Sequence, residues 1–201
     1  MDSGTGVLPP LCGHTNAVTS VTFSPDGTQI ASASLDIIVR MWDAIVGHEN
    51  RAPLRGHERL VTSVVYSPDG KRILSGSKDR TFRVWDPTLG IEILKPFRGH
   101  TDTILSVVIS SNGECVASGS IDGSIRTRHA QTGCKGPTLQ AQGTDRVQSI
   151  IFFPDGKCLA SISHPDNRVR IWGVTVGAQF FSSVLRNSIA LSPDGTLVTG
   201  H

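Results

Sequence analysis

Short apolar stretches recur along the chain, and turn residues separate them. The segments 18–23 (VTSVTF), 28–34 (TQIASAS) and 37–42 (IIVRMW) are rich in Val, Ile and Thr, a composition typical of β-strands. Ser24 to Gly27 (SPDG) supplies the Pro and Gly that a tight turn between two strands needs. No stretch keeps a helical period over three turns. The pattern therefore predicts an all-β protein.

Three landmarks repeat at an almost constant distance. The Gly-His pairs Gly13-His14, Gly56-His57 and Gly99-His100 are 43 residues apart. The SPDG turn returns at residues 67–70, then as SSNG at 110–113, FPDG at 153–156 and SPDG at 192–195. Trp-Asp occurs at 42–43 and 85–86, and Trp-Gly at 172–173. A fixed period of this length indicates a repeat architecture.

The combination of Gly-His, SPDG and Trp-Asp at this spacing resembles the WD40 family, over nearly the whole chain. The resemblance implies a β-propeller of four-stranded antiparallel blades, here about four and a half of them, which makes an incomplete propeller. We expect a flexible N-terminus at 1–6 and a WD40 repeat domain at 7–201. Its repeats are expected at 7–43, 50–86, 93–129 and 136–173, with a partial repeat at 180–201.

In that family each repeat contributes the outer strand of one blade and three strands of the next. Residues 7–12 are then an outer strand, and blade one uses 18–23, 29–34, 38–42 and 52–54. Blades two, three and four are expected to begin near residues 61, 104 and 147, and a fragment of a fifth near 184. The spacing between the turn glycines Gly156 and Gly195 is 39, about four residues shorter than the usual 43. Phe180 and Phe181 then belong to the outer strand of blade four or to the loop after it.

The resemblance also implies a hydrogen-bonded tetrad of His, Ser, Asp and Trp within each blade. Matching residue by residue gives His14, Ser32, Asp36 and Trp42, then His57, Ser75, Asp79 and Trp85, then His100, Ser118 and Asp122, and finally Ser161, Asp166 and Trp172. A Ser-His-Asp set could be taken for a catalytic triad, but catalysis does not need one copy per repeat. These residues are therefore interpreted as structural, and no catalytic residue and no enzyme activity are expected.

Two blades depart from the pattern. Arg128 stands at the Trp position of blade three, where a guanidinium is costly to bury. It could donate to Ser118, or swing outward and leave a void, and blade three is expected to be the weak blade. Blade four has Gly143 in place of His and one extra residue, with Pro165, before Asp166.

Composition and charge narrow the classes of function. The net charge of +2 argues against a dedicated nucleic-acid binder. No apolar run reaches the length of a membrane helix, and no signal peptide opens the chain, so an intracellular location is expected. The cysteines Cys12, Cys115, Cys134 and Cys158 form no CxxC motif, so neither a metal site nor any cofactor is expected.

About four and a half repeats make fewer blades than the seven that WD40 rings usually resemble. The chain could be a fragment of a longer protein, two copies could pair to close a ring, or four blades with a remnant could close as a small ring. An open array leaves unpaired edges through which copies can self-associate.

The first functional hypothesis is a non-catalytic scaffold that binds other proteins or peptides through the loops on one face. The family pattern points to the loop after each Gly-His and to the residue before each turn Asp. These positions are Asn16, Ala17, Arg59, Leu60, Asp102, Thr103, Asp145 and Arg146, with Leu35, Lys78, Ile121 and Pro165. The alternatives are the C-terminal sensor part of a longer NACHT-type signalling ATPase, a fragment without independent function, and an enzyme. This chain contains no phosphate-binding GxxxxGK[ST] loop.

Overall fold

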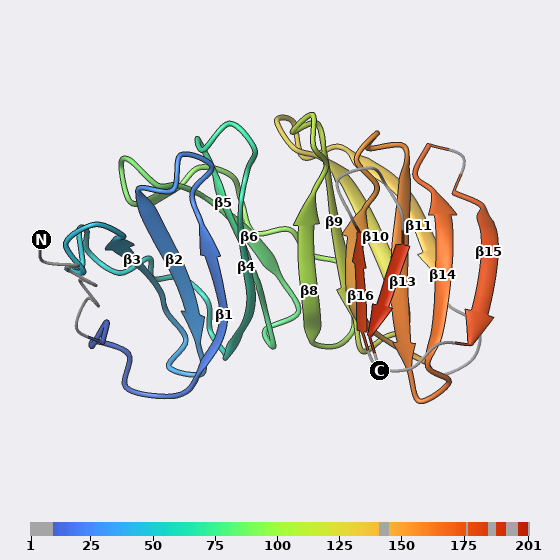
Figure 1. Cartoon of the computed structure of the whole chain (residues 1–201), viewed down its shortest axis with the longest axis horizontal. Coiled ribbons are helices and arrows are strands. Elements are labelled where there is room, and N and C mark those ends of the chain that lie inside the picture. Colours follow the sequence, from blue (N-terminus) through green and yellow to red (C-terminus); the bar gives the residue numbers. More distant parts are fainter. Residues whose placement is uncertain (1–9, 141–144, 176, 185–187, 192–196, 201) are drawn as a thin grey trace, which may run out of the picture.

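Consecutive antiparallel sheets fan out along the molecule (Figure 1), and we call each sheet a blade. The computed structural model describes residues 10–140, 145–175, 177–184, 188–191 and 197–200. The described elements are all strands, arranged in consecutive antiparallel sheets, so the expected all-β fold, an incomplete propeller of antiparallel blades, is confirmed. In this described part of the chain, no helix has the length and hydropathy needed to traverse a bilayer.

Each blade is built from strands that follow one another in the chain. Blade one contains β1 (Val18–Phe23), β2 (Gln29–Ser34) and β3 (Val39–Asp43). Blade two contains β4 (Val61–Tyr66), β5 (Ile73–Ser77), β6 (Phe82–Asp86) and β7 (Ile91–Glu92). Blade three contains β8 (Ile104–Ile109), β9 (Cys115–Ser120), β10 (Ser124–His129) and β11 (Lys135–Gln140). Blade four contains β12 (Arg146–Phe152), β13 (Cys158–His164), β14 (Arg168–Gly173) and β15 (Gln179–Val184), and the hairpin β16 (Ser188–Leu191) and β17 (Leu197–Gly200) follows.

The outer strand of blade one differs from the prediction. Residues 52–54 form no regular strand, and the backbone of the outer segment pairs with β3 through two isolated bridges, Trp42↔Glu49 and Val39↔Leu54. Four residues lie between Glu49 and Leu54, whereas two lie between Val39 and Trp42, so the two backbones cannot stay in register. Pro53 also lacks the N–H that a ladder hydrogen bond needs.

Both ends of the array also differ in part from the prediction. Residues 10–12 form no strand, and residues 7–9 lie outside the described part. The fifth blade begins at β16, residue 188 and not 184, because residues 179–184 pair with β14 as the outer strand of blade four. The placement of Phe180 and Phe181 in that outer strand is confirmed.

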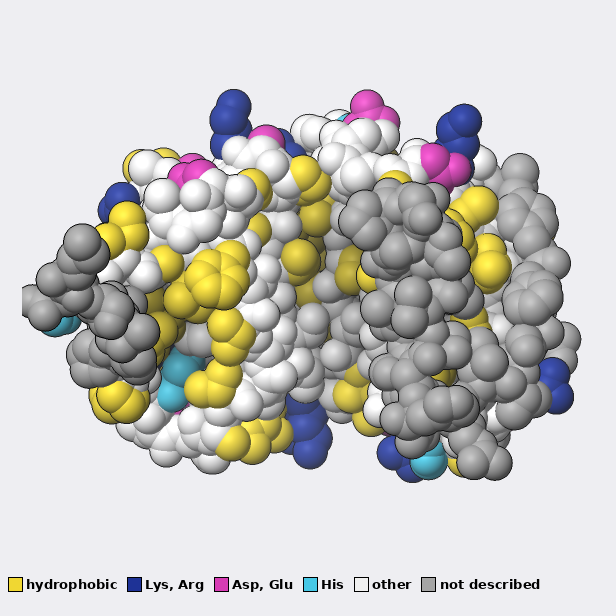
Figure 2. Space-filling model, viewed as in Figure 1, with side chains coloured by type: hydrophobic (Ala, Val, Ile, Leu, Met, Phe, Trp, Pro, Cys, Tyr) yellow, Lys and Arg dark blue, Asp and Glu magenta, His cyan; other side chains and the backbone are white. Residues whose placement is uncertain are grey.

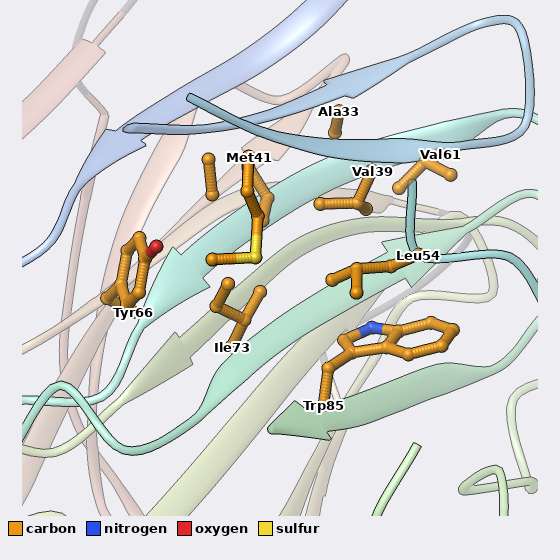
Figure 3. Packing of buried hydrophobic residues seen from close by; sticks show 10 residues of the cluster. Ala33, Val39, Met41, Leu54, Val61, Tyr66, Ile73 and Trp85 are labelled. Atoms are coloured by element: carbon orange, nitrogen blue, oxygen red, sulfur yellow. The ribbon is translucent and has the colours of Figure 1, made fainter. Parts of the chain in front are cut away.

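Neighbouring blades pack through the first strand of each. Val61, Val64 and Tyr66 of β4 are buried against Ala31, Ala33 and Met41 of blade one. Figure 3 shows Ala33 and Met41 of blade one together with Val61 and Tyr66 of blade two in this packed cluster. The contact needs small residues on one side: at Gly76 of β5 a Cβ atom would lie 2.8 Å from Ile104 of blade three.

Hydroxyl groups tie the same strands together. Thr19 Oγ1 of β1 donates to the carbonyl of Val61 at 2.7 Å, and Thr62 Oγ1 of β4 donates to that of Ile104 at 2.6 Å. Ser63 Oγ accepts the backbone N–H of Val107 at 3.2 Å, and Ser106 Oγ accepts that of Ile150 at 3.3 Å. With Ser20 Oγ, which accepts the backbone N–H of Val64 at 3.2 Å, the Ser contact recurs at three blade interfaces, whereas the Thr contact recurs at the first two.

The first strand of blade one has an uncovered face. Val18, Val21 and Phe23 are 50%, 57% and 60% exposed, and Figure 2 shows hydrophobic side chains gathered over this side of the molecule. The residues one repeat later, Val61, Val64 and Tyr66, are at most 5% exposed. No described residue thus covers the β1 face as blade one covers β4.

Candidate functional site

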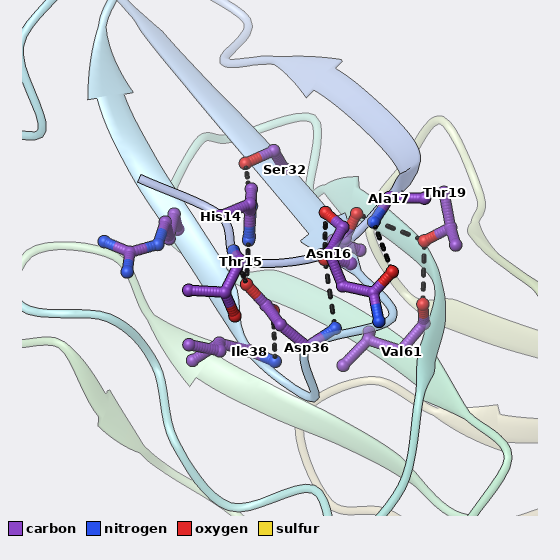
Figure 4. Close-up of polar contacts among 12 residues, drawn as sticks. His14, Thr15, Asn16, Ala17, Thr19, Ser32, Asp36, Ile38 and Val61 are labelled. Carbon is purple, nitrogen blue, oxygen red and sulfur yellow. Dashed lines mark hydrogen bonds and ion pairs between the residues drawn. The ribbon is translucent and has the colours of Figure 1, made fainter. Parts of the chain in front are cut away.

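A chain of hydrogen bonds crosses blade one from its sheet to its loops (Figure 4). The indole Nε1–H of Trp42 donates to Ser32 Oγ at 2.8 Å, and Ser32 Oγ lies 2.7 Å from His14 Nε2. His14 Nδ1 lies 2.8 Å from Asp36 Oδ2. Because the carboxylate only accepts, Nδ1 carries the proton and Nε2 accepts from Ser32. Every donor in this chain therefore has an acceptor.

The same chain recurs in blade two, and blade three keeps its His, Ser and Asp without the Trp. In blade two, Trp85, Ser75, His57 and Asp79 are linked at 2.8, 2.7 and 2.8 Å. In blade three, His100 contacts Ser118 at 2.9 Å and Asp122 at 3.0 Å. The Asp carboxylates also accept the backbone N–H that follows each His, at Thr15, Glu58 and Thr101. The tetrads therefore hold the loop after each Gly-His pair.

These contacts change the acidity of the turn aspartates. Burial alone would raise the pKa of the Asp79 carboxyl, but hydrogen bonds from His57, Thr81 and the Glu58 backbone outweigh it. The pKa of Asp79 therefore lies below its ordinary value. The pKa of Asp122 is lowered in the same way, because His100, Ser124 and the Thr101 backbone outweigh burial. Asp36 shifts in the same direction through His14.

The Ser hydroxyls of the tetrads have no access to a substrate. Ser32, Ser75 and Ser118 are at most 4% exposed, and in blades one and two the hydroxyl oxygen also accepts the indole N–H. A catalytic Ser must present its oxygen to the substrate. Among the described residues, no three His, Cys, Asp or Glu side chains gather as metal ligands would. The geometry fits a structural role for these groups.

Arg128 takes neither of the two expected positions in blade three. It is 8% exposed, and its Nη2 donates to the carbonyl of Arg98 at 2.9 Å rather than to Ser118. Its guanidinium lies over the ring of Phe97, 5.6 Å from the centroid, and Phe97 stacks on Phe82 at 4.4 Å. Burial, together with the nearby charge of Arg126, lowers the pKa of Arg128. Ser118 has therefore lost its indole donor.

In blade four an arginine holds the turn aspartate. Trp172 Nε1 donates to Ser161 Oγ at 2.8 Å, as in blades one and two. Gly143, at the His position, lies outside the described residues. Arg170, which is 3% exposed, donates to Asp166 at 2.6 Å, to Ser163 at 2.8 Å and to Asp145 at 3.3 Å. Asp166 is therefore held through an ion pair.

The loops predicted to bind partners lie side by side at one end of the strands. The backbone N–H of Leu35 donates to the carbonyl of Ala17, that of Lys78 to Leu60, and that of Ile121 to Thr103, each at 2.9 Å. A buried Ser then fixes each loop: Ser34, Ser77 and Ser120 donate to the carbonyls of Asn16, Arg59 and Asp102 at 3.0–3.1 Å. Three blades thus present paired loops in the same way.

Most of the predicted contact residues reach the surface. Asn16, Ala17, Arg59, Lys78, Asp102, Arg146 and Pro165 are exposed, and Leu35, Leu60, Ile121 and Asp145 are partly exposed. The prediction that Thr103 lies at the surface is wrong. Its side chain is only 6% exposed, because Thr103 directly precedes β8, whose first residue is buried. Asp145 is partly occupied by its ion pair with Arg170.

Sequence reasoning missed one recurring residue of the site. Arg40, Arg83, Arg126 and Arg170 occupy the same place in the third strand of each blade, and the near-constant spacing could have revealed them. The same arginines pack against the Gly of each Gly-His pair and leave no room for a side chain there. At Gly56 a Cβ atom would lie 2.8 Å from Arg83 Nη1 and 3.0 Å from the Trp85 ring.

Comparison with known families identifies the repeats. The WD40 pattern (WD domain, G-beta repeat) matches residues 7–43, 48–86, 91–127 and 133–173, which is more than half of the chain. The chain belongs to the WD40 family. The hydrogen-bonded tetrads of blades one and two lie within the first two matched repeats, and Arg170 lies within the fourth.

Similar WD40 stretches occur in curated proteins. One is 57% identical over 37 residues to Protein Mut11 of Chlamydomonas reinhardtii, covering 18% of this chain and 10% of that protein. Another is 58% identical over 33 residues to Notchless protein homolog of Arabidopsis thaliana, covering 16% and 7%. A third is 49% identical over 41 residues to U3 small nucleolar RNA-associated protein 21 of Saccharomyces cerevisiae, covering 20% and 4%. The matches span a tenth or less of each relative, about one WD40 repeat.

Proposed function

We propose that this WD40 chain is a non-catalytic scaffold that binds another protein or peptide through its paired loops. The observation that carries the proposal is the loop pairing itself: Ala17 with Leu35, Leu60 with Lys78, and Thr103 with Ile121. Buried serines and aspartates fix these loops, so little conformational entropy is lost when a partner binds.

The chemistry of the loops supports a protein partner. Leu35, Leu60 and Ile121 are partly exposed, and the charged residues Arg59, Lys78 and Asp102 surround them. Aliphatic side chains with a charged rim are typical of protein contacts. Because both signs of charge are present, the surface does not resemble the basic footprint that a nucleic acid requires.

A competition between two matched double variants tests the proposal. Peptides selected from a displayed library on the purified chain would be titrated against Leu60→Glu/Ile121→Glu. The control is Leu89→Glu/Ile91→Glu, which alters two apolar residues that are 66% and 51% exposed on the turn after β6 and at the start of β7. We expect the loop variant to bind at least about tenfold more weakly, the loss of one buried contact. Equal binding by the loop variant, or an equal loss in the control, overturns the proposal.

We also propose an intracellular location. Cys12 and Cys134 are exposed free thiols, which persist in reducing compartments, and one relative is named as associated with a small nucleolar RNA. A fluorescent fusion should remain inside the cell, and its secretion would contradict the proposal.

A further inference from the structure

The third-strand arginine has a carboxylate partner in the first two blades. Arg40 Nη1 donates to both oxygens of Glu49 at 2.6 and 2.7 Å, and Arg83 Nη1 donates to Glu92 Oε2. Both glutamates stand on the outer segment of their blade, opposite the tetrad Trp: Trp42 pairs with Glu49 and Trp85 with Glu92. The outer rim of each blade thus supplies a carboxylate to its arginine.

Blade three has the arginine without the carboxylate. In blade three, Arg128 occupies the place of the tetrad Trp, and the residue that pairs with it is Lys135. Lys135 therefore stands where the first two blades have Glu49 and Glu92. Among the described residues, nothing accepts a hydrogen bond from the Arg126 guanidinium, whereas Arg40 and Arg83 donate through Nη1 to their glutamates. The Nε atoms of all three arginines are buried without a partner. A position that holds an anion in two blades is therefore lined by cations in the third.

Among the hollows lined by Arg128 and Lys135, one of about 540 Å³ also has Glu114 and Asp155 in its lining. Two others at this rim are lined by basic residues and by no carboxylate. The smaller, about 30 Å³, is lined by Arg126, Arg128 and Lys135 together with Thr127, Gly136 and Thr138. The larger, about 400 Å³, shares Arg128 and Lys135 and adds Lys95 and Arg98. Its remaining lining includes the apolar side chains Leu94, Pro96 and Phe97. The hollow therefore combines basic walls with an apolar side.

The cations at this rim are not neutralised within the described part of the chain. None of Lys95, Arg98, Arg126, Arg128 and Lys135 forms an ion pair with a described residue. Arg126 and Arg128 both lie against the Arg98–Gly99 segment, because Arg128 donates to the Arg98 carbonyl and Arg126 stands 3.0 Å from a Cβ built on Gly99. Packing against this segment holds the cations close together without an anion between them.

We propose that this rim, which we call the basic rim (Arg126, Arg128 and Lys135 with Lys95 and Arg98), binds an acidic peptide segment of a partner protein. A glutamate or aspartate carboxylate of the partner takes the place that Glu49 and Glu92 occupy in the first two blades. An apolar side chain next to it enters the larger hollow against Phe97. Charge-assisted contacts between guanidinium and carboxylate supply the attraction.

The test is the binding of a fluorescein-labelled peptide of alternating Glu and Leu, followed by anisotropy at low salt. Lys135→Glu supplies the missing carboxylate within the chain, so we expect it to weaken peptide binding about tenfold or more, the effect of one lost charge-assisted contact. Its melting temperature should equal or exceed that of the wild type, because Glu at 135 pairs with Arg126. The matched control, Lys71→Glu, reverses an exposed charge on the turn after β4 and should bind as the wild type does.

Four outcomes overturn the proposal: no binding by the wild type, equal binding by Lys135→Glu, equal loss in Lys71→Glu, or equal binding of a peptide with Gln in place of Glu. A single-stranded oligonucleotide is titrated in parallel. If it binds more tightly than the peptide and Lys135→Glu abolishes its binding, the rim is a nucleic-acid site and the acidic-peptide assignment is wrong. The loop variants of the proposed scaffold surface leave this site unaltered, so the two proposals fail separately.

Discussion

At the scale of single residues, the Ser hydroxyl is the connecting group of each tetrad. In blade two Ser75 accepts from Trp85 and donates to His57, and His57 donates to Asp79. Each group has one role that no neighbour can take over, since the indole only donates and the carboxylate only accepts. Removal of one member therefore leaves buried partners unsatisfied.

Asp79 should make stability depend on pH. Its pKa lies below the ordinary value of about 4, so the folded chain binds fewer protons than the unfolded chain as the pH falls. The stabilisation is complete above about pH 4 and is lost as the pH falls below it. We expect Asp79→Asn to cost about 2–3 kcal/mol at pH 7, the range for a hydrogen-bonded charge, and to flatten the acid limb. Urea unfolding between pH 7 and pH 3 measures both effects, with the exposed-loop variant Glu58→Gln as control; an unchanged acid limb would contradict the assignment.

Replacement of Arg128 by Trp should stabilise blade three. Trp at this place can donate to Ser118, as Trp85 does to Ser75, and the cost of a desolvated guanidinium disappears. We expect a gain of about 1–2 kcal/mol, which raises the melting temperature by roughly 4 °C in a chain of this size. Calorimetry of Arg128→Trp tests this, and an unchanged or lower melting temperature would disprove it. The same variant should bind the acidic peptide more weakly, because it removes a cation of the basic rim.

The tetrad positions could be assigned from the sequence because the spacing is fixed by the strands that carry them. The position of the Arg128 side chain could not be predicted from the sequence. It depends on contacts with Phe97 and the Arg98 carbonyl, which lie in the segment directly before Gly99-His100. The burial of Thr103 was also missed, since only the exact start of β8 decides it.

At the scale of the strand, β14 carries two arginines that contact the same carboxylate. Arg170 is buried and joins Asp166, Asp145 and Ser163, whereas the Arg168 side chain is 48% exposed and 3.6 Å from Asp166. The two residues form a matched pair for a stability test.

We expect Arg170→Met to cost about 2–3 kcal/mol, because it leaves two partly buried carboxylates without their buried cation. Arg168→Met should change stability by less than about 0.5 kcal/mol, since its ion pair is exposed. Denaturant titration of both variants measures the difference. Equal effects would show that Arg170 does not hold the turn of blade four.

The boundaries of most strands could be read from the repeat, and those at the ends of blades could not. Pro53 and a mismatch in residue number break the outer strand of blade one, and the fifth blade begins at residue 188 and not 184, because β15 extends to Val184. Inner strands are fixed by burial on both faces, whereas outer strands depend on loop length.

At the scale of the whole molecule, no residue in the described part of the chain covers the β1 face. Val18, Val21 and Phe23 are exposed where the equivalent side chains of β4 are buried. Burial of each such side chain contributes roughly 1.5–3 kcal/mol. The face is shaped for another blade, and a second copy of the chain can provide one.

We therefore expect residues 1–201 to self-associate through β1 and Val21→Lys/Phe23→Lys to reduce the mass measured by light scattering. The control is Ile45→Lys/Val46→Lys, which alters two apolar residues that are 70% and 53% exposed in the turn after β3. A mass that is monomeric in the wild type, or reduced equally by both variants, would refute association through this face.

The hydroxyl links between blades have a consequence for how such a molecule can change in length. Thr19 with Val61 and Thr62 with Ile104 each join one blade to the next and to no other. Stability in such an array is a sum of neighbour terms. Duplication or loss of a DNA segment that encodes one whole period therefore adds or removes a blade while the junction it creates keeps the old contacts. Recombination within the gene can thus lengthen or shorten the array without inventing a new interface.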